Sequence, residues 1–114
     1  MTLEGTLETT VTAREPARVS FVFTVTNTGA EPVEIQFTDA AKAEFIVYEN
    51  GSERWRFTDG RAFMQLLSSD RLEPNASTTY DGEWEDPEPG TYTAIAQLRA
   101  QDTTCEARTE FSLE

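Results

Sequence analysis

The chain has 114 residues, a length typical of one domain around one hydrophobic core, so we expect residues 1–114 to form a single unit. Its 21 acidic and 9 basic residues give a formal net charge of −12, which repels nucleic-acid phosphates and anionic membranes and argues against both as partners. It has no histidine and one cysteine, so the common Ser–His and Cys–His catalytic pairs, an intramolecular disulfide and a zinc cluster are all excluded.

Apolar and polar residues alternate along the first half of the chain with the period of two that half-buried strands show. Four strands are predicted there, over residues 3–13, 19–25, 32–37 and 43–49. The second has the clearest buried face, made of Val19, Phe21, Phe23 and Val25. The fourth is apolar on both faces, which predicts that it lies inside the fold.

The second half begins with Asn50–Gly51, a dipeptide favoured at two-residue hairpin turns because both positions tolerate a positive φ. The turn leads into a strand over residues 53–57, with Trp55 and Phe57 on one face. Three more strands are predicted, over residues 78–84, 92–98 and 105–113. Cys105 falls on the apolar face of the last one, so we interpret it as a small core residue and not as a nucleophile.

Eight short strands and no convincing helix predict an all-β fold: an antiparallel immunoglobulin-like β-sandwich of about eight strands. The Cys–Trp–Cys arrangement of antibody domains is absent. The prediction therefore concerns the architecture and not membership of the antibody family.

Residues 58–72 do not follow the alternation, and they are apolar in the middle. Loops of this length are uncommon in compact domains and are often functional. Two interpretations stay open: the apolar residues pack over an end of the sandwich or form a short helical turn, or they project toward a partner. The second interpretation makes candidate contact residues of Phe63, Met64, Gln65, Leu66 and Leu67.

Four runs share the pattern of one protein family. They are FTVTNTG at residues 23–29, PVEIQF at 32–37, WRFTDGRAFMQ at 55–65 and PGTY at 89–92. Together they resemble the BsuPI-type intracellular proteinase inhibitors, over about residues 19–100. The resemblance implies an immunoglobulin-like domain, not an enzyme, that binds and inhibits subtilisin-type serine proteases of the cytoplasm. We separately expect no cofactor and no metal, and the resemblance carries no reactive bond over to a position here.

Two other functions stay open. One is a non-inhibitory β-sandwich domain that binds another protein. The other is a calcium-stabilised module, suggested by a series of acids, namely Asp81, Glu83, Glu85, Asp86 and Glu88. Calcium takes about six to eight oxygen ligands in a closed geometry, whereas alternate acids of one strand point to solvent. An enzyme is least favoured, because no two carboxylates are marked as a paired acid and base.

The kinds of charge also carry information. Eight of the nine basic residues are Arg and only Lys42 is Lys, while Glu outnumbers Asp by 15 to 6. Avoidance of lysine indicates a halophilic protein, whose charges are screened within about 3 Å in molar salt; an acidic mesophile with Arg-rich codon usage is the alternative. The acidic start of the chain does not resemble a signal peptide, and no apolar run approaches the ~20 residues of a membrane span. We therefore expect a cytoplasmic monomer.

Overall fold

The structure is a computed structural model that describes residues 3–12, 17–101 and 103–113. These residues form nine strands and no helix. The strands are β1 (Leu3–Thr12), β2 (Arg18–Asn27), β3 (Val33–Asp39), β4 (Ala43–Glu49), β5 (Ser52–Arg56), β6 (Gln65–Leu72), β7 (Ser77–Glu85), β8 (Gly90–Leu98) and β9 (Glu106–Leu113). The predicted end of the first strand at Ala13 lies outside the described residues.

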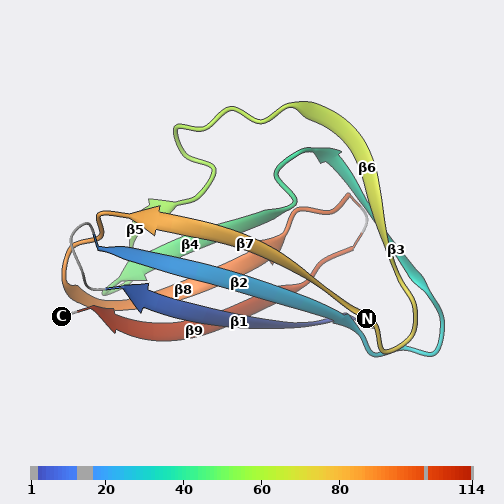
Figure 1. Ribbon diagram of the computed structural model, residues 1–114, viewed down its shortest axis with the longest axis horizontal. Coiled ribbons are helices and arrows are strands. Elements are labelled where there is room, and N and C mark those ends of the chain that lie inside the picture. Colours follow the sequence, from blue (N-terminus) through green and yellow to red (C-terminus); the bar gives the residue numbers. More distant parts are fainter. Residues whose placement is uncertain (1–2, 13–16, 102, 114) are drawn as a thin grey trace.

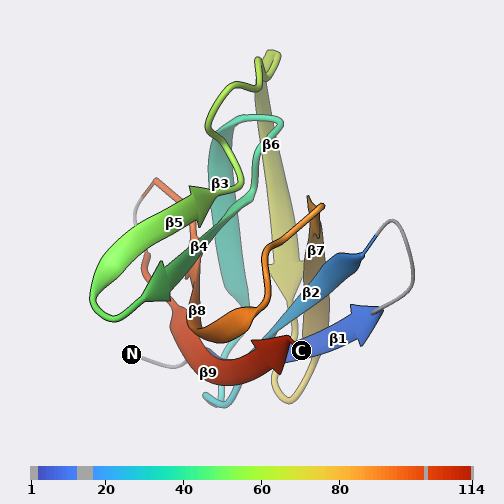
Figure 2. The ribbon, with the colours of Figure 1, turned by 90° about the vertical axis from the view of Figure 1, so that its left-hand side faces the viewer.

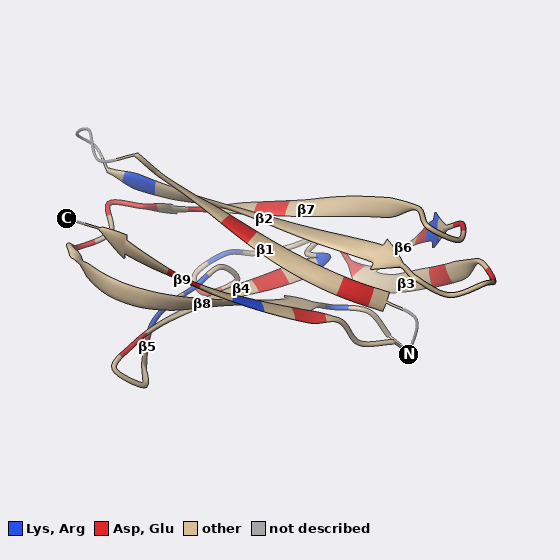
Figure 3. Ribbon diagram, turned by 90° about the horizontal axis from the view of Figure 1, so that it is seen from below, with Lys and Arg blue, Asp and Glu red and all other residues tan. Residues whose placement is uncertain are grey.

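Two antiparallel sheets lie face to face and make the body of the molecule, as the edge-on view shows (Figure 3). One sheet has the strand order β1–β2–β7 and the other has the order β5–β4–β8–β9. The predicted all-β immunoglobulin-like sandwich is confirmed. The number of strands differs by one, because β6 was not predicted.

Aromatic side chains join the two sheets across the interior. The inner face predicted for β2 is fully buried, and it consists of Val19, Phe21, Phe23 and Val25. Phe45 of β4 stacks on Phe21 with ring centroids 5.6 Å apart. Trp55 stacks on Phe21 at 5.7 Å and on Trp84 at 5.8 Å. Stacked and edge-to-face aromatic pairs add to the stabilisation that burial of their area provides.

β4 is the strand most enclosed by the fold. Its first five residues, 43–47, are buried on both faces, which confirms the prediction from its apolar sequence. Glu44 is nevertheless among them, at 6% exposure. The predicted hairpin turn from β4 to β5 is also confirmed, with φ values of 51° at Asn50 and 81° at Gly51.

The first and last strands, β1 and β9, lie side by side at one border of the sandwich (Figure 1). Gly5 permits this approach, because a Cβ atom there would lie 2.7 Å from the Phe23 ring and 3.0 Å from Cys105 Sγ. Cys105 is buried, as predicted. Burial also raises the pKa of its thiol.

β3 and β6 pair only with each other and form a two-stranded sheet, which we call the arm. Figure 2 shows one end of the arm rising above the sandwich. The arm corrects the prediction of a single loop over residues 58–72, since the second half of that stretch is a strand. The strand β6 forms because β3 lies beside it and supplies the backbone hydrogen-bond partners that a single short strand lacks.

Candidate functional site

Residues 58–64 leave β5 as an arch and return to the molecule as β6 (Figure 1). A turn closes the near side of the arch, where the Arg61 amide donates to the Thr58 carbonyl at 3.3 Å. The far side is tied to the end of β3, where the Ala40 amide donates to the Met64 carbonyl at 2.9 Å. The arch and β6 together make up the predicted contact segment, residues 58–72.

The most exposed large apolar side chains of the described residues gather where the arch becomes β6. Met64 is 72% exposed, Leu66 is 53% exposed and Leu67 is 81% exposed. A register shift explains the two adjacent leucines: Phe37 pairs with Ser68 and Asp39 with Gln65, so Leu66 and Leu67 together face Thr38 alone. Such a β-bulge interrupts the alternation of faces, and both leucines therefore point away from the interior.

The five predicted contact residues divide into two groups. Met64, Gln65, Leu66 and Leu67 are exposed. Phe63 is half-buried, and its ring lies 6.0 Å from the ring of Phe57. The Arg61 guanidinium also lies over the Phe57 ring, 4.5 Å from its centre. The packing interpretation therefore describes Phe63, and the projecting interpretation describes the other four residues.

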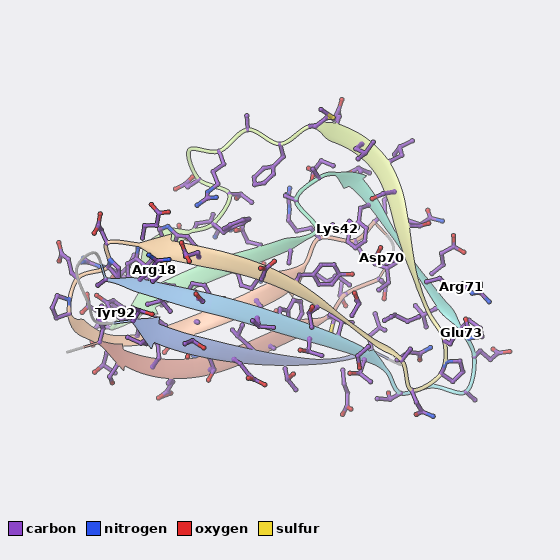
Figure 4. The ribbon with its side chains drawn as sticks, in the orientation of Figure 1. Arg18, Lys42, Asp70, Arg71, Glu73 and Tyr92 are labelled. Carbon is purple, nitrogen blue, oxygen red and sulfur yellow. The ribbon has the colours of Figure 1, made fainter. Side chains whose placement is uncertain are left out.

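A polar cluster holds the inward face of β6. The Asp70 carboxylate lies 3.2 Å from the Lys42 ammonium (Figure 4). It also accepts a 2.8 Å hydrogen bond from the Tyr80 hydroxyl. Burial, and then the hydrogen bond to Asp70, raise the pKa of the Tyr80 phenol. Lys42 itself is half-buried, with its ammonium 5.3 Å from the centre of the Phe37 ring.

A cleft of about 390 Å³ lies beside this cluster. Its walls come from the arch, from the link between β3 and β4, and from β6 and β7, and the lining residues are Ala40, Ala41, Lys42, Ala43, Phe57, Phe63, Asp70, Thr78, Thr79, Tyr80 and Asp81. Phe63 therefore forms one wall of the cleft while its neighbour Met64 faces solvent. The arch thus has an inner face turned to the cleft and an outer face with exposed apolar side chains.

Two carboxylates with structural importance were not singled out from the sequence. Glu44 accepts hydrogen bonds from Thr58 at the start of the arch, and Asp70 joins β6 to β7. Glu44 stands in an otherwise apolar strand, and Asp70 lies two residues before the buried Leu72, on the same face of β6. A charged residue at a position where an apolar one is expected is the feature of the sequence that could have identified both.

The acidic series on and after β7 shows no metal-binding geometry. Asp81 and Glu85 are exposed, and half-exposed Glu83 lies 3.7 Å from the guanidinium of Arg18. Across residues 3–12, 17–101 and 103–113, no group of three or more potential metal-ligating side chains is close enough to hold an ion. The same ranges contain no helix with the length and apolarity of a membrane span.

Comparison with solved structures places the fold among β-sandwich domains of diverse proteins. The chain is similar to the CARDB domain of PF1109 from Pyrococcus furiosus, with 15% identity, 98% of this chain and 94% of that chain covered, and a TM-score of 0.53. The chain is also similar to the putative ApaA protein of Bordetella pertussis, with 13% identity, 98% of this chain and 88% of that chain covered, and a TM-score of 0.50. A beta-glucuronidase of Bacteroides uniformis gives 12% identity and a TM-score of 0.58, and this chain spans 14% of its length. Identities this low establish the fold alone.

The sequence comparison establishes the family. The model of BsuPI, the intracellular proteinase inhibitor family, matches residues 6–103, and the chain therefore belongs to this family. The match includes the whole arch and both strands of the arm. No curated protein matches the sequence.

Proposed function

We propose that this protein inhibits an intracellular subtilisin-type serine protease, and that the apolar outer face of residues 63–67 contacts the enzyme. Its family is that of intracellular proteinase inhibitors, which supports a protease as the partner. The observation that carries the choice of surface is the exposure of Met64, Leu66 and Leu67 beside one another. Clustered apolar side chains of this kind are typical of protein-binding sites.

The segment also meets the physical requirement for tight inhibition. An inhibitor loses less conformational entropy on binding when its contact residues are already held in place. The arch is fixed by the hydrogen bond between Ala40 and Met64, by the packing of Phe63 on Phe57 and by the pairing of β6 with β3. The exposed side chains are therefore presented on an ordered backbone.

Strand addition is the binding mode that this arrangement favours. Among the described residues β6 pairs with β3 on one side only, so its other edge can accept an extended segment of a partner. In this mode main-chain hydrogen bonds supply affinity, and pockets for side chains such as Leu67 supply specificity. We further propose that the chain acts as a single-domain monomer in the cytoplasm, in high salt, and without catalysis of its own.

An inhibition assay against an intracellular subtilisin in molar salt tests the proposal. Met64→Ala and Leu67→Ala should each weaken inhibition by about thirtyfold, which is ~2 kcal/mol for an apolar anchor. Val22→Ala is the matched control, because Val22 is also an exposed apolar residue, at 39%, but lies on β2. Its inhibition constant should equal that of the parent protein.

The outcomes separate the alternatives. If folded Met64→Ala and Leu67→Ala inhibit as well as the parent, the outer face of the arch is not the contact surface. If the parent inhibits no protease of this class, the protein is a non-inhibitory interaction domain. Circular dichroism of each variant excludes a loss of inhibition that only reports unfolding.

A further inference from the structure

Glu44 is a charged side chain enclosed by the fold. The buried polar and charged residues in the described part of the chain are Asn27 and Glu44, and only the second carries a charge. It stands on β4 between Ala43 and Phe45, both of them core residues. Burial of a carboxylate costs several kcal/mol unless hydrogen bonds and a counter-charge compensate it. The contacts of Glu44 therefore indicate what the residue does.

Those contacts converge on the place where the arch begins. Glu44 Oε1 accepts hydrogen bonds from the backbone amides of Phe45, at 3.1 Å, and Thr58, at 3.2 Å. Glu44 Oε2 accepts a hydrogen bond from the Thr58 hydroxyl and lies 3.5 Å from the guanidinium of Arg56. Each oxygen thus has two partners, and three of the four partners belong to residues 56–58.

The cluster fixes the backbone at the exit from β5. The Phe57 amide donates to the Phe45 carbonyl at 2.9 Å, so Phe57, the residue before Thr58, is also tied to β4. Phe57 then supports Phe63 through their ring contact, and Met64 follows Phe63 directly. Glu44 is thereby connected to the outer face of the arch through a short series of contacts.

We propose that Glu44 is the positioning residue of the contact segment: its carboxylate fixes Thr58 and so holds the arch in the conformation that a protease binds. The proposal rests on the proposed inhibitory function. A hydrophobic residue at this position would complete the apolar sequence of β4 without any desolvation cost. The carboxylate instead supplies directional bonds to Thr58, which apolar packing cannot replace.

The chemical test uses the pair Glu44 and Thr58. Glu44→Gln keeps the shape and one acceptor oxygen but places an amide nitrogen, a donor, among donors. Thr58→Val removes the hydroxyl and keeps the β-branched shape, whereas Thr58→Ser keeps the hydroxyl. Glu44→Gln and Thr58→Val should each raise the inhibition constant by about tenfold, the loss expected when an ordered segment becomes mobile. Thr58→Ser should inhibit like the parent, and the double variant Glu44→Gln/Thr58→Val should be little worse than either single variant.

A second readout separates positioning from a general loss of stability. Amide hydrogen exchange over residues 58–64 should become faster in Glu44→Gln and stay unchanged in β9. Phe111→Leu in β9 is the control, because the ring contacts of Phe111 are with Phe21 and Tyr92, outside residues 56–64. This variant should weaken the core while leaving exchange at 58–64 and the inhibition constant unchanged. Glu44→Gln with parental exchange over 58–64 would overturn the proposal, as would additive effects of Glu44→Gln and Thr58→Val. If the parent itself fails to inhibit, the proposed function is wrong, and the exchange experiment still decides whether Glu44 holds the arch.

Discussion

The Tyr80 hydroxyl of β7 donates a 2.8 Å hydrogen bond to the carboxylate of Asp70 on β6. β6 and β7 belong to different sheets, so this bond joins the arm to the sandwich. Lys42 adds a second connection, 3.2 Å from the same carboxylate. Glu44 binds Thr58 at the start of the arch, and Asp70 lies on β6 after the exposed leucines. A hydrogen-bonded carboxylate therefore lies on each side of the candidate contact residues 63–67.

The Tyr80–Asp70 bond makes stability depend on alkaline pH. The folded state raises the pKa of Tyr80 above the unfolded value of about 10. The stabilisation is therefore complete below about pH 10 and is lost progressively above it, as the pH rises toward the raised pKa of the folded state, because the unfolded chain releases the proton first. Tyr80→Phe should cost about 1–2 kcal/mol at neutral pH, and its difference from the parent should shrink as the pH rises above about 10.

Urea unfolding at several pH values measures this difference. Tyr48→Phe is the control, since Tyr48 is a half-buried tyrosine of β4 outside the Asp70 cluster. A constant difference between Tyr80→Phe and the parent above about pH 10 would show that the folded state, by burial and by the bond to Asp70, does not raise the pKa of the phenol.

Salt should stabilise the fold. The net charge of −12 makes the compact state repel itself at low ionic strength. The Debye length falls from about 30 Å at 0.01 M to about 3 Å at 1 M, which removes most of that repulsion. Thermal melts across this range should show a rising midpoint. A constant or falling midpoint would contradict the halophilic interpretation.

Cys105 should react slowly with a thiol reagent in the folded protein. It is 8% exposed and burial raises its pKa, so little reactive thiolate is available. Labelling should become fast once the protein is unfolded. Cys105→Ser should lower the free energy of unfolding by about 1–3 kcal/mol, because a hydroxyl would be buried without a designed partner. Fast labelling of the native protein would show that this end of the chain opens readily.

Gly5→Ala should be destabilising although alanine suits most positions better than glycine. The added methyl group would meet the Phe23 ring at 2.7 Å and the Glu106 carbonyl oxygen at 3.1 Å, and the backbone oxygen cannot move away alone. Overpacking of this kind costs about 1–3 kcal/mol. Gly60→Ala is a useful comparison, because Gly60 has open space around it and a φ of 72°, so its cost of about 1 kcal/mol would come from the backbone alone. Equal melting points for Gly5→Ala and the parent would mean that β1 can move away from β9.

The sandwich could be predicted from the sequence because its strands obey one simple rule. β2 alternates without interruption, and Asn50–Gly51 has the chemistry of its turn. β6 could not be predicted, because the bulge sets both Leu66 and Leu67 opposite Thr38 and breaks the alternation on which strand prediction depends. The whole of β6, which is the second half of residues 58–72, was therefore interpreted as part of a loop.

The candidate site was predictable in part for a related reason. Apolar composition drew attention to residues 63–67, and four of these side chains are exposed. The separate orientation of Phe63 depends on Phe57, whose ring position is a tertiary property. Glu44 and Asp70 act through partners 14 and 10 residues away in sequence, and no local pattern indicates such pairs.

The one-sided pairing of β6 has a consequence for the behaviour of many copies together. An unprotected strand edge that carries Met64, Leu66 and Leu67 is also a template for the same edge of another molecule. In dilute salt, mutual repulsion between molecules of charge −12 keeps such edges apart. In molar salt that long-range protection disappears, and the bulge at Leu66–Leu67, which twists the edge and interrupts its ladder, remains as the local obstacle to self-association. The irregularity that displays the leucines to a partner thus also hinders the growth of aggregates from them.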